Sequence, residues 1–210
     1  MQNVAVVDFG TGNLRSVHKA LEHVTDGHVE VTRDAGRIVA ADRVVLPGQG
    51  AMGSWLSAMQ DFGLRDAIEE VLATRPVLGI CLGLQALTRH SDEDGGVDGL
   101  GFFDGVCKRF SPDPAVDGVA QKVPHMGWNQ VSQKAHTLWH GIDDMTRFYF
   151  VHSYFAELAG PEDVAGTTNY INEFVCAAAR DNVFAVQFHP EKSHHQGLIL
   201  LKNFVNWPGE

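Results

Sequence analysis

The sequence predicts an α/β fold in which a central, mostly parallel sheet carries helices on both faces and an added antiparallel portion. Three observations support this prediction. Strand-like and helix-like segments alternate through the first half of the chain, which is the order of a parallel sheet with crossover helices. The second half has more segments with the two-residue alternation of strands. Glycine and proline stand at the ends of apolar runs, where they favour turns.

The first half supplies the parallel sheet. Pro47 and Gly48 are expected to stop its third strand. Apolar residues at helical spacing predict a helix through Val17, Leu21 and Val24, a second helix over 64–72 and a short third one over 82–88. The strand-like runs are residues 4–8, 28–32, 44–46 and 77–80.

The second half supplies the antiparallel portion. Prolines and aspartates over 111–122 predict an exposed loop, and apolar spacing over 196–207 predicts a closing helix. No repeat or low-complexity tract interrupts the chain, so we expect a single domain over residues 1–210. The alternating segments are residues 102–110, 147–155, 164–168, 174–179 and 183–188.

The composition excludes several classes of protein. Of the 210 residues, 16 are Lys or Arg and 26 are Asp or Glu, which gives a formal net charge of −10. An acidic chain repels phosphate backbones, so nucleic-acid binding is not expected. The apolar runs are far shorter than the roughly 20 residues that span a bilayer, and the N-terminus lacks the basic start of a signal peptide. Cys81, Cys107 and Cys176 form an odd, widely spaced set that fits a reducing compartment, so we expect a cytoplasmic protein with no membrane partner.

A cysteine flanked by glycines stands between the fourth strand and the helix that follows it. The string GICLGLQ, residues 79–85, has the strand–turn–helix arrangement of a nucleophile elbow, with the sulfur of Cys81 in place of a serine oxygen. The helix N-terminus favours the thiolate, and the N–H of Leu82 is placed where an oxyanion would form. The alternative is a buried structural cysteine at the end of a strand.

A nucleophilic cysteine needs a base, and the string QFHPE provides a candidate after the last strand. His189 and Glu191 are two residues apart, and Pro190 favours an extended step that turns both side chains the same way. The imidazole can then face the thiol while the carboxylate orients it, as in a Cys-His-Glu triad. The alternative is a solvated loop end, and it would be preferred if the cysteine elbow were absent.

Together these strings resemble the triad of class I glutamine amidotransferases. Further strings are similar to the glutaminase subunits of imidazole glycerol phosphate synthase, and the similarity runs in matching order from about residue 4 to residue 204. The strings are DFGTGNL (8–14), LPGQGAMG (46–53), PHMGWN (124–129), YFVHSY (149–154) and HPEKS (189–193).

The resemblance implies the flavodoxin-like amidotransferase fold and hydrolysis of glutamine to glutamate and ammonia without a cofactor. Cys81 would form a glutamyl thioester, His189 would move the protons, and Glu191 would orient His189. The positions that would bind the substrate or form the oxyanion hole are Gly48, Gln49, Gly50, Leu82 and Gln85.

The resemblance also implies a partner, a (β/α)8 cyclase subunit that receives the ammonia and makes imidazole glycerol phosphate and AICAR from PRFAR in histidine biosynthesis. Met126 and Trp128 beside Gly127 are typical of interface anchors at a turn, although Trp128 and Tyr149 would equally suit a core. The positions that match the interface and ammonia gate are Asn13, Pro124, Met126, Trp128, Tyr149 and Lys192.

Some features depart from the family pattern or lie outside it. Gln49 stands where many members have an aliphatic residue, so the polarity of the oxyanion loop differs. The pairs His136/His140 and His194/His195 lack a ligand partner at metal-binding spacing, so we expect no metal site. We interpret Cys107 and Cys176 as small buried apolar residues.

Three other functions are compatible with parts of this pattern. A class I amidotransferase serving another synthase would need other interface strings than PHMGWN. An inactive regulatory module would usually have lost the Cys, His or Glu of the triad, and all three are present. A free-standing cysteine hydrolase would act at full rate without a partner.

Overall fold

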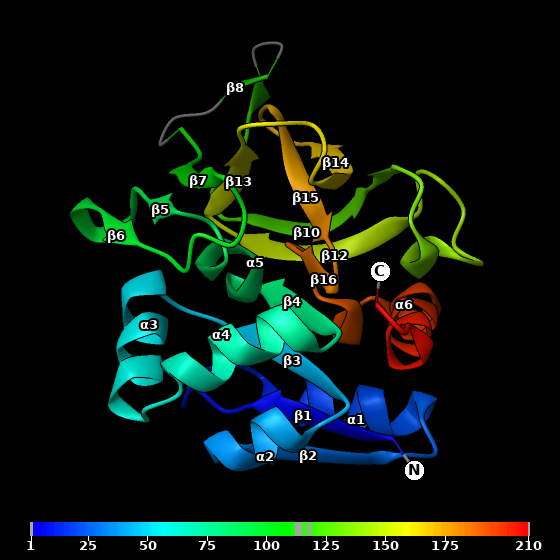
Figure 1. The fold of residues 1–210 in the computed structure, drawn as a ribbon. Helices are drawn as coiled ribbons and strands as arrows, with labels where there is room; N and C mark the ends of the chain where they lie inside the picture. Colours follow the sequence, from blue (N-terminus) through cyan, green and yellow to red (C-terminus); the bar gives the residue numbers. More distant parts are fainter. Residues whose placement is uncertain (1, 112–114, 117–118, 210) are drawn as a thin grey trace.

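In the computed structural model, which describes residues 2–111, 115–116 and 119–209, a twelve-stranded sheet runs through both halves of the chain (Figure 1). Its first part is parallel, with the order β2-β1-β3-β4-β16. This confirms the predicted central parallel sheet, to which the last strand of the chain is added beside β4. The bounds are β1 (Asn3–Val7), β2 (His28–Thr32), β3 (Arg43–Gly48), β4 (Val77–Cys81) and β16 (Val183–Val186).

Helices cover both faces of the parallel part, as predicted. On one face α1 (Leu14–Val24) and α6 (His194–Asn206) pack against each other, over a core that includes Val4 and Val6. The alternate residues Ala5 and Val7 enter the core on the other face. Strand β1 is therefore buried on both sides, which explains its unbroken apolar run. The second face carries α2 (Ala35–Ala40), α3 (Met52–Asp61), α4 (Arg65–Thr74) and the short α5 (Leu82–Ala86).

The antiparallel portion continues the same sheet. Strand β15 (Glu173–Arg180) pairs antiparallel with β16, and β13 (Tyr154–Leu158) follows it. Beyond β13 lie β7 (Gly105–Arg109), β5 (His90–Ser91) and β6 (Val97–Asp98), while β14 (Val164–Asn169) and β11 (Ser132–Gln133) branch from β15. Separate ladders join β10 (His125–Gln130) to β12 (Arg147–His152) and β8 (Ala115–Val116) to β9 (Val119–Ala120). Short 3-10 turns are η1 (Glu93–Gly95), η2 (Thr137–Trp139) and η3 (Pro190–Lys192).

Several predicted boundaries are wrong. The segment 147–155 is two strands that break at Ser153, where the chain leaves β10 and begins to pair with β7. Only Gly105–Arg109 of the segment 102–110 is a strand, and α2 and α3 were not predicted. The expected loop 111–122 contains the β8–β9 ladder, while its residues 112–114 and 117–118 lie outside the described part of the chain.

Strand β10 was also missed, because its pattern is inverted. Met126 and Trp128 lie in this strand and not at a turn, and their side chains are exposed. The polar His125 is the buried residue of the same strand. A strand whose apolar side chains face solvent does not show the pattern of a core strand.

Candidate active site

The nucleophile candidate lies at the junction of β4 and α5. Cys81 is the last residue of β4 and the N-cap of α5, with φ 55° and ψ −105°. A positive φ is strained for a residue with a side chain, and strain of this kind is typical of a nucleophile elbow. The predicted strand–turn–helix context of Cys81 is therefore confirmed. Cys81 lines a pocket at the carboxyl ends of the parallel strands, the usual ligand edge of such a sheet.

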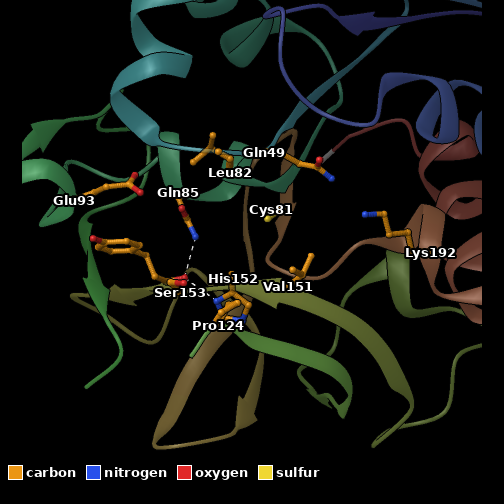
Figure 2. A pocket seen from close by; sticks show the side chains of 12 residues that line it. Gln49, Cys81, Leu82, Gln85, Glu93, Pro124, Val151, His152, Ser153 and Lys192 are labelled. Carbon is orange, nitrogen blue, oxygen red and sulfur yellow. Dashed lines mark hydrogen bonds between the residues drawn. The ribbon is translucent and has the colours of Figure 1, made fainter. Parts of the chain in front are cut away.

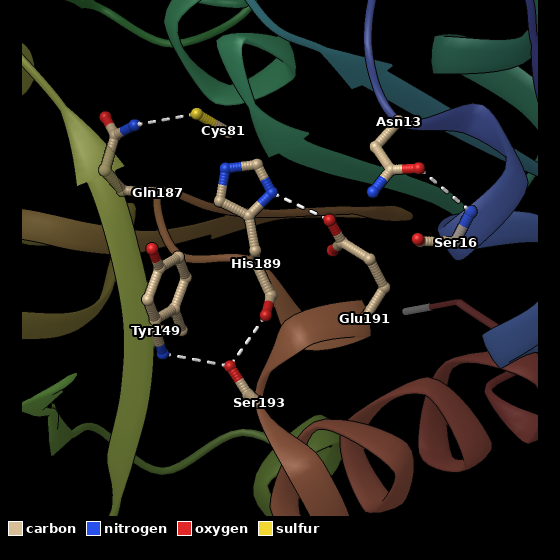
Figure 3. A network of polar contacts seen from close by, with 8 residues as sticks. All are labelled: Asn13, Ser16, Cys81, Tyr149, Gln187, His189, Glu191 and Ser193. Carbon is tan, nitrogen blue, oxygen red and sulfur yellow. Dashed lines mark hydrogen bonds and ion pairs between the residues drawn. The ribbon is translucent and has the colours of Figure 1, made fainter. Parts of the chain in front are cut away.

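His189 follows β16 and reaches the same edge. Its Nδ1 lies 2.8 Å from Oε1 of Glu191, while Nε2 is turned toward Cys81 (Figure 3). Burial alone disfavours the imidazolium and lowers the pKa of His189. The Cys81 thiolate and the Glu191 carboxylate outweigh burial and raise this pKa to about 10. A pKa of about 10 favours the charged imidazolium form of His189 at neutral pH.

Backbone contacts fix the segment that carries His189. The N–H of His189 donates to the carbonyl of Tyr149 at 2.9 Å. Ser193 closes the arrangement, because its hydroxyl donates to the carbonyl of His189 at 2.6 Å and accepts from the N–H of Tyr149 at 3.0 Å (Figure 3). Ser193 is buried at the start of α6, so the position of His189 is tied to that helix.

Gln187 contacts the sulfur as well, a role that was not predicted from the sequence. Its Nε2 donates to Sγ of Cys81 at 3.6 Å, and its Oε1 accepts from Nε2 of Gln85 at 3.0 Å. Gln85 donates its second hydrogen to the carbonyl of Tyr154 at 2.9 Å. Side chains of a strand alternate between its two faces, so the position of Gln187 two residues before His189 indicates that both point the same way.

The carbonyl of Tyr154 also ends a second hydrogen-bond chain. Nδ1 of His152 lies 2.7 Å from this oxygen, which only accepts, so Nδ1 of His152 is the donor. Its Nε2 must then accept from Nδ1 of His125 at 3.0 Å, and Nε2 of His125 accepts from Nδ2 of Asn129 at 3.4 Å. Burial lowers the pKa of His125 to about 4 and that of His152 to about 3, so both rings are neutral.

The pocket in front of Cys81 is a cavity of about 390 Å³. Figure 2 shows Glu93 at one end, Lys192 at the other and Cys81 between them. Glu93 is held by the N–H of Met52, which donates to its Oε2 at 2.6 Å. The volume suits a small ligand, and the two ends offer opposite charges. Other lining residues are Gln49, Gly50, Leu82, Gln85, Pro124, Val151, His152, Ser153 and Tyr154.

The predicted oxyanion residues lie together. A Cβ placed on Gly48, at the end of β3, would lie 2.9 Å from Cβ of Leu82 and 2.8 Å from Cδ1 of Trp55. The loop therefore rests directly on Leu82, the residue after Cys81. Gln49 and Gly50 continue from it along the pocket, and Gly50 has φ +95° with no atom within 4 Å of a built Cβ.

Two of the residues assigned to a partner interface reach this pocket. Pro124 and Lys192 line it. Trp128 pairs with Tyr149 across β10 and β12, at 6.1 Å between ring centroids, and stacks on His194 at 4.8 Å. Trp128 is 42% exposed and Met126 63% exposed, so neither is a core residue. Asn13 caps α1 by accepting from the N–H of Ser16, near Glu191 in Figure 3.

The remaining cysteines differ from Cys81. Cys107 and Cys176 are fully buried, as expected of small apolar residues. Burial raises the pKa of Cys107 to about 12 and raises that of Cys176 as well, which keeps both thiols protonated. In the described part of the chain, no group of three or more His, Cys, Asp or Glu side chains could hold a metal ion. No helix among the described residues is long and apolar enough to cross a bilayer.

Comparisons with known proteins agree with this geometry. The family model of class-I glutamine amidotransferases matches residues 5–207. A protein of Nitrosomonas europaea named imidazole glycerol phosphate synthase subunit HisH is 54% identical over 211 residues, covering 99% of each chain. A protein of the same name from Dechloromonas aromatica is 56% identical over 210 residues, covering 98% of this chain and 97% of the relative.

Solved structures show the same fold at low identity. The structure of PurLQS from Thermotoga maritima has a TM-score of 0.73 at 16% identity, over 98% of both chains. A structure described as a glutamine amidotransferase has a TM-score of 0.73 at 15% identity, over 97% of both chains.

Proposed function

Since the chain belongs to the class-I glutamine amidotransferase family, and within it to the HisH subunits of imidazole glycerol phosphate synthase, we propose that Cys81, His189 and Glu191 form its catalytic triad. Membership makes the chain a glutamine-hydrolysing enzyme subunit of histidine biosynthesis. The observation that carries the triad is the convergence of Cys81 and the buried His189–Glu191 pair at one sheet edge.

The proposed reaction has two steps. The Cys81 thiolate attacks the carboxamide carbon of glutamine, a C–S bond forms, and the C–N bond breaks as His189 gives its proton to the departing ammonia. Water then attacks the thioester carbon, passes a proton to His189, and the C–S bond breaks to release glutamate and the thiolate. Glu191 holds the imidazole in place and stabilises its cationic form in both steps.

Substrate recognition is proposed for the end of the pocket at Glu93. The fixed carboxylate of Glu93 would accept the α-ammonium group of glutamine, and Oε1 of Gln85 would remain available to it because both Nε2 hydrogens are already used. The N–H of Leu82, together with an N–H of the loop Gly48–Gly50, would bind the oxyanion. Gln49 belongs to this loop, and its polar side chain lines the pocket.

The ammonia is proposed to pass to a (β/α)8 cyclase subunit, which uses it to make imidazole glycerol phosphate and AICAR from PRFAR. The exposed Met126 and Trp128 lie on β10, the strand that directly follows the pocket-lining Pro124, and they support docking of that subunit on this side. Pro124 and Lys192 line the pocket, Asn13 and Tyr149 are proposed as further contacts, and the charge of Lys192 would pair with an acidic group of the cyclase.

The triad is tested by Cys81→Ser in the complex. Because serine is a far poorer nucleophile with the same base, synthesis from glutamine should be lost. Synthesis from added ammonium salts should stay near the wild-type rate, since that reaction uses the partner alone. Equal loss of both activities would contradict the assignment. Full glutaminase activity of the isolated chain would instead favour a free-standing hydrolase.

A further inference from the structure

We infer that Gln187 is a fourth side chain of the nucleophilic centre, donating a hydrogen bond to the sulfur of Cys81 in an orientation fixed by Gln85. The inference rests on the proposed role of Cys81 as the nucleophile. It adds a neutral donor to the triad, on a residue whose side chain is completely buried at the end of β16.

The backbone places Gln187 and His189 on one face. The N–H of Gln187 donates to the carbonyl of Cys176 at 2.8 Å, which extends the pairing of β15 with β16 by one residue. Phe188 points the opposite way, into an aromatic core where its ring stacks on Phe148 at 4.1 Å. Figure 3 shows the side chains of Gln187 and His189 both directed toward Cys81.

The direction of the amide follows from a backbone carbonyl. The oxygen of Tyr154 can only accept, so the group of Gln85 that contacts it at 2.9 Å is the NH2 group. The same NH2 group lies 3.0 Å from the Gln187 amide, which must therefore present its oxygen there. The nitrogen of Gln187 is left to face the sulfur at 3.6 Å. A thiolate accepts such a bond more strongly than a thiol does, so Gln187 stabilises the reactive form.

The same donor acts again when the thioester is hydrolysed. The sulfur regains its negative charge as the C–S bond breaks, and the amide of Gln187 is already in place to receive it. His189 and Gln187 then serve the same atom differently. The imidazole exchanges a proton, whereas the amide keeps both of its hydrogens.

The test is the pH dependence of Cys81 alkylation by iodoacetamide in the full-length chain. Gln187→Met keeps the size of the side chain and removes the donor, and Gln187→Glu keeps an acceptor for Gln85. We expect the midpoint of the profile to move up by about one pH unit in both variants, so that they react about ten-fold more slowly at pH values below the wild-type midpoint. The limiting rate at high pH should stay within about two-fold, because a thiolate with fewer hydrogen bonds is no weaker a nucleophile.

Glutamine hydrolysis is measured in parallel in the complex with the cyclase subunit. We expect kcat of Gln187→Met to fall about ten-fold and KM to change less than about two-fold, since Gln85 stays anchored on Tyr154. Gln133→Met is the matched control, because Gln133 donates to the carbonyl of Asp143 at 2.8 Å away from the pocket. Its alkylation profile should be that of the wild type.

The possible results distinguish the inference about Gln187 from the proposed function. A folded Gln187→Met or Gln187→Glu chain with the wild-type alkylation profile would overturn the inference. A lower melting temperature with that unchanged profile would also overturn it, since the role would then be structural. If the wild-type complex does not hydrolyse glutamine, the proposed function fails, while a shifted alkylation profile still supports the contact between Gln187 and the sulfur.

Discussion

Nδ1 of His189 lies 2.8 Å from Oε1 of Glu191, and the two side chains are only 2% and 1% exposed. A carboxylate so far from water interacts strongly with the ring it touches. The contact directs Nε2 of His189 at Cys81, and it contributes to the raised pKa of the imidazole.

Replacing this carboxylate should change both rate and pH dependence. Glu191→Gln keeps the shape but removes the charge, so kcat for glutamine hydrolysis should fall on the order of 10²-fold or more. The pKa of His189 should drop from about 10, because one of the groups that raise it is lost. The alkaline limb of the pH–rate profile of the complex should therefore move to lower pH.

The control for that experiment is Glu157→Gln, which removes a carboxylate from an exposed pair with Lys108. Its pH–rate profile should match the wild type. An alkaline limb that stays in place in Glu191→Gln would show that the carboxylate does not act on His189.

Trp128 should be an anchor for the cyclase subunit. Its ring is held between Tyr149 and His194, so little side-chain entropy remains to be lost on docking. Trp128→Ala should raise the dissociation constant about 30-fold, or about 2 kcal/mol, in a titration against the cyclase. Phe62→Ala is the matched control, since Phe62 is an exposed aromatic residue at the end of α3. Equal affinity of the folded Trp128→Ala chain and the wild type would remove Trp128 from the interface.

The buried pair His125–His152 should make the fold sensitive to acid. The pKa of each ring is lower in the folded chain than the usual 6.5, because burial disfavours the charged form. The stability from neutral rings is therefore fully present above pH 6.5 and is lost as pH falls toward about 4 and 3. Between pH 7 and pH 5 the free energy of unfolding should drop by about 2 kcal/mol for each ring kept neutral.

Urea unfolding at the two pH values measures this effect. His125→Phe keeps the stacking on Tyr170 and Phe150 but removes one titrating group, so its unfolding free energy should depend less on pH. His140→Phe, at an exposed histidine, should keep the wild-type slope. Identical slopes in all three chains would contradict the assignment.

The isolated chain should be a slow glutaminase that the cyclase with bound acceptor accelerates. If one oxyanion N–H is missing at rest, the deficit is about 10²–10³-fold in rate. Gly50 has φ +95°, and turning over the peptide that joins it to Gln49 would bring φ into the negative region. Gly50→Ala strains the resting loop by about 1–2 kcal/mol without a clash, so the basal rate should rise several-fold.

Glutamate release is compared for the chain alone, the complex, and the complex with acceptor. Gly63→Ala is the matched control, because Gly63 has φ +63° and equal open space but lies after α3. Equal rates in all three states would exclude a switch in this loop. A Gly50→Ala chain with an unchanged basal rate would exclude this peptide as its moving part.

The sequence predicted the structure correctly where each residue answers to one requirement, either burial in the core or formation of a turn. The parallel strands and the turn at Cys81 follow from apolar runs and from the glycines beside Cys81. The prediction failed where the polarity of a residue does not match its burial, or where its role depends on distant contacts. Strand β10 turns Met126 and Trp128 outward and buries His125, so its apolar residues do not mark its buried face. Gln187 was missed because its role depends on contacts with Gln85 and Cys81, which are about a hundred residues away in the chain.

The carbonyl of Tyr154 accepts from both Gln85 and His152, so two hydrogen-bond chains end on one oxygen that cannot pass a proton on. Neither chain is a proton wire. Solvent protons that reach Asn129 or His125 have no route through this carbonyl to the sulfur. Proton exchange at Cys81 therefore does not pass through this carbonyl.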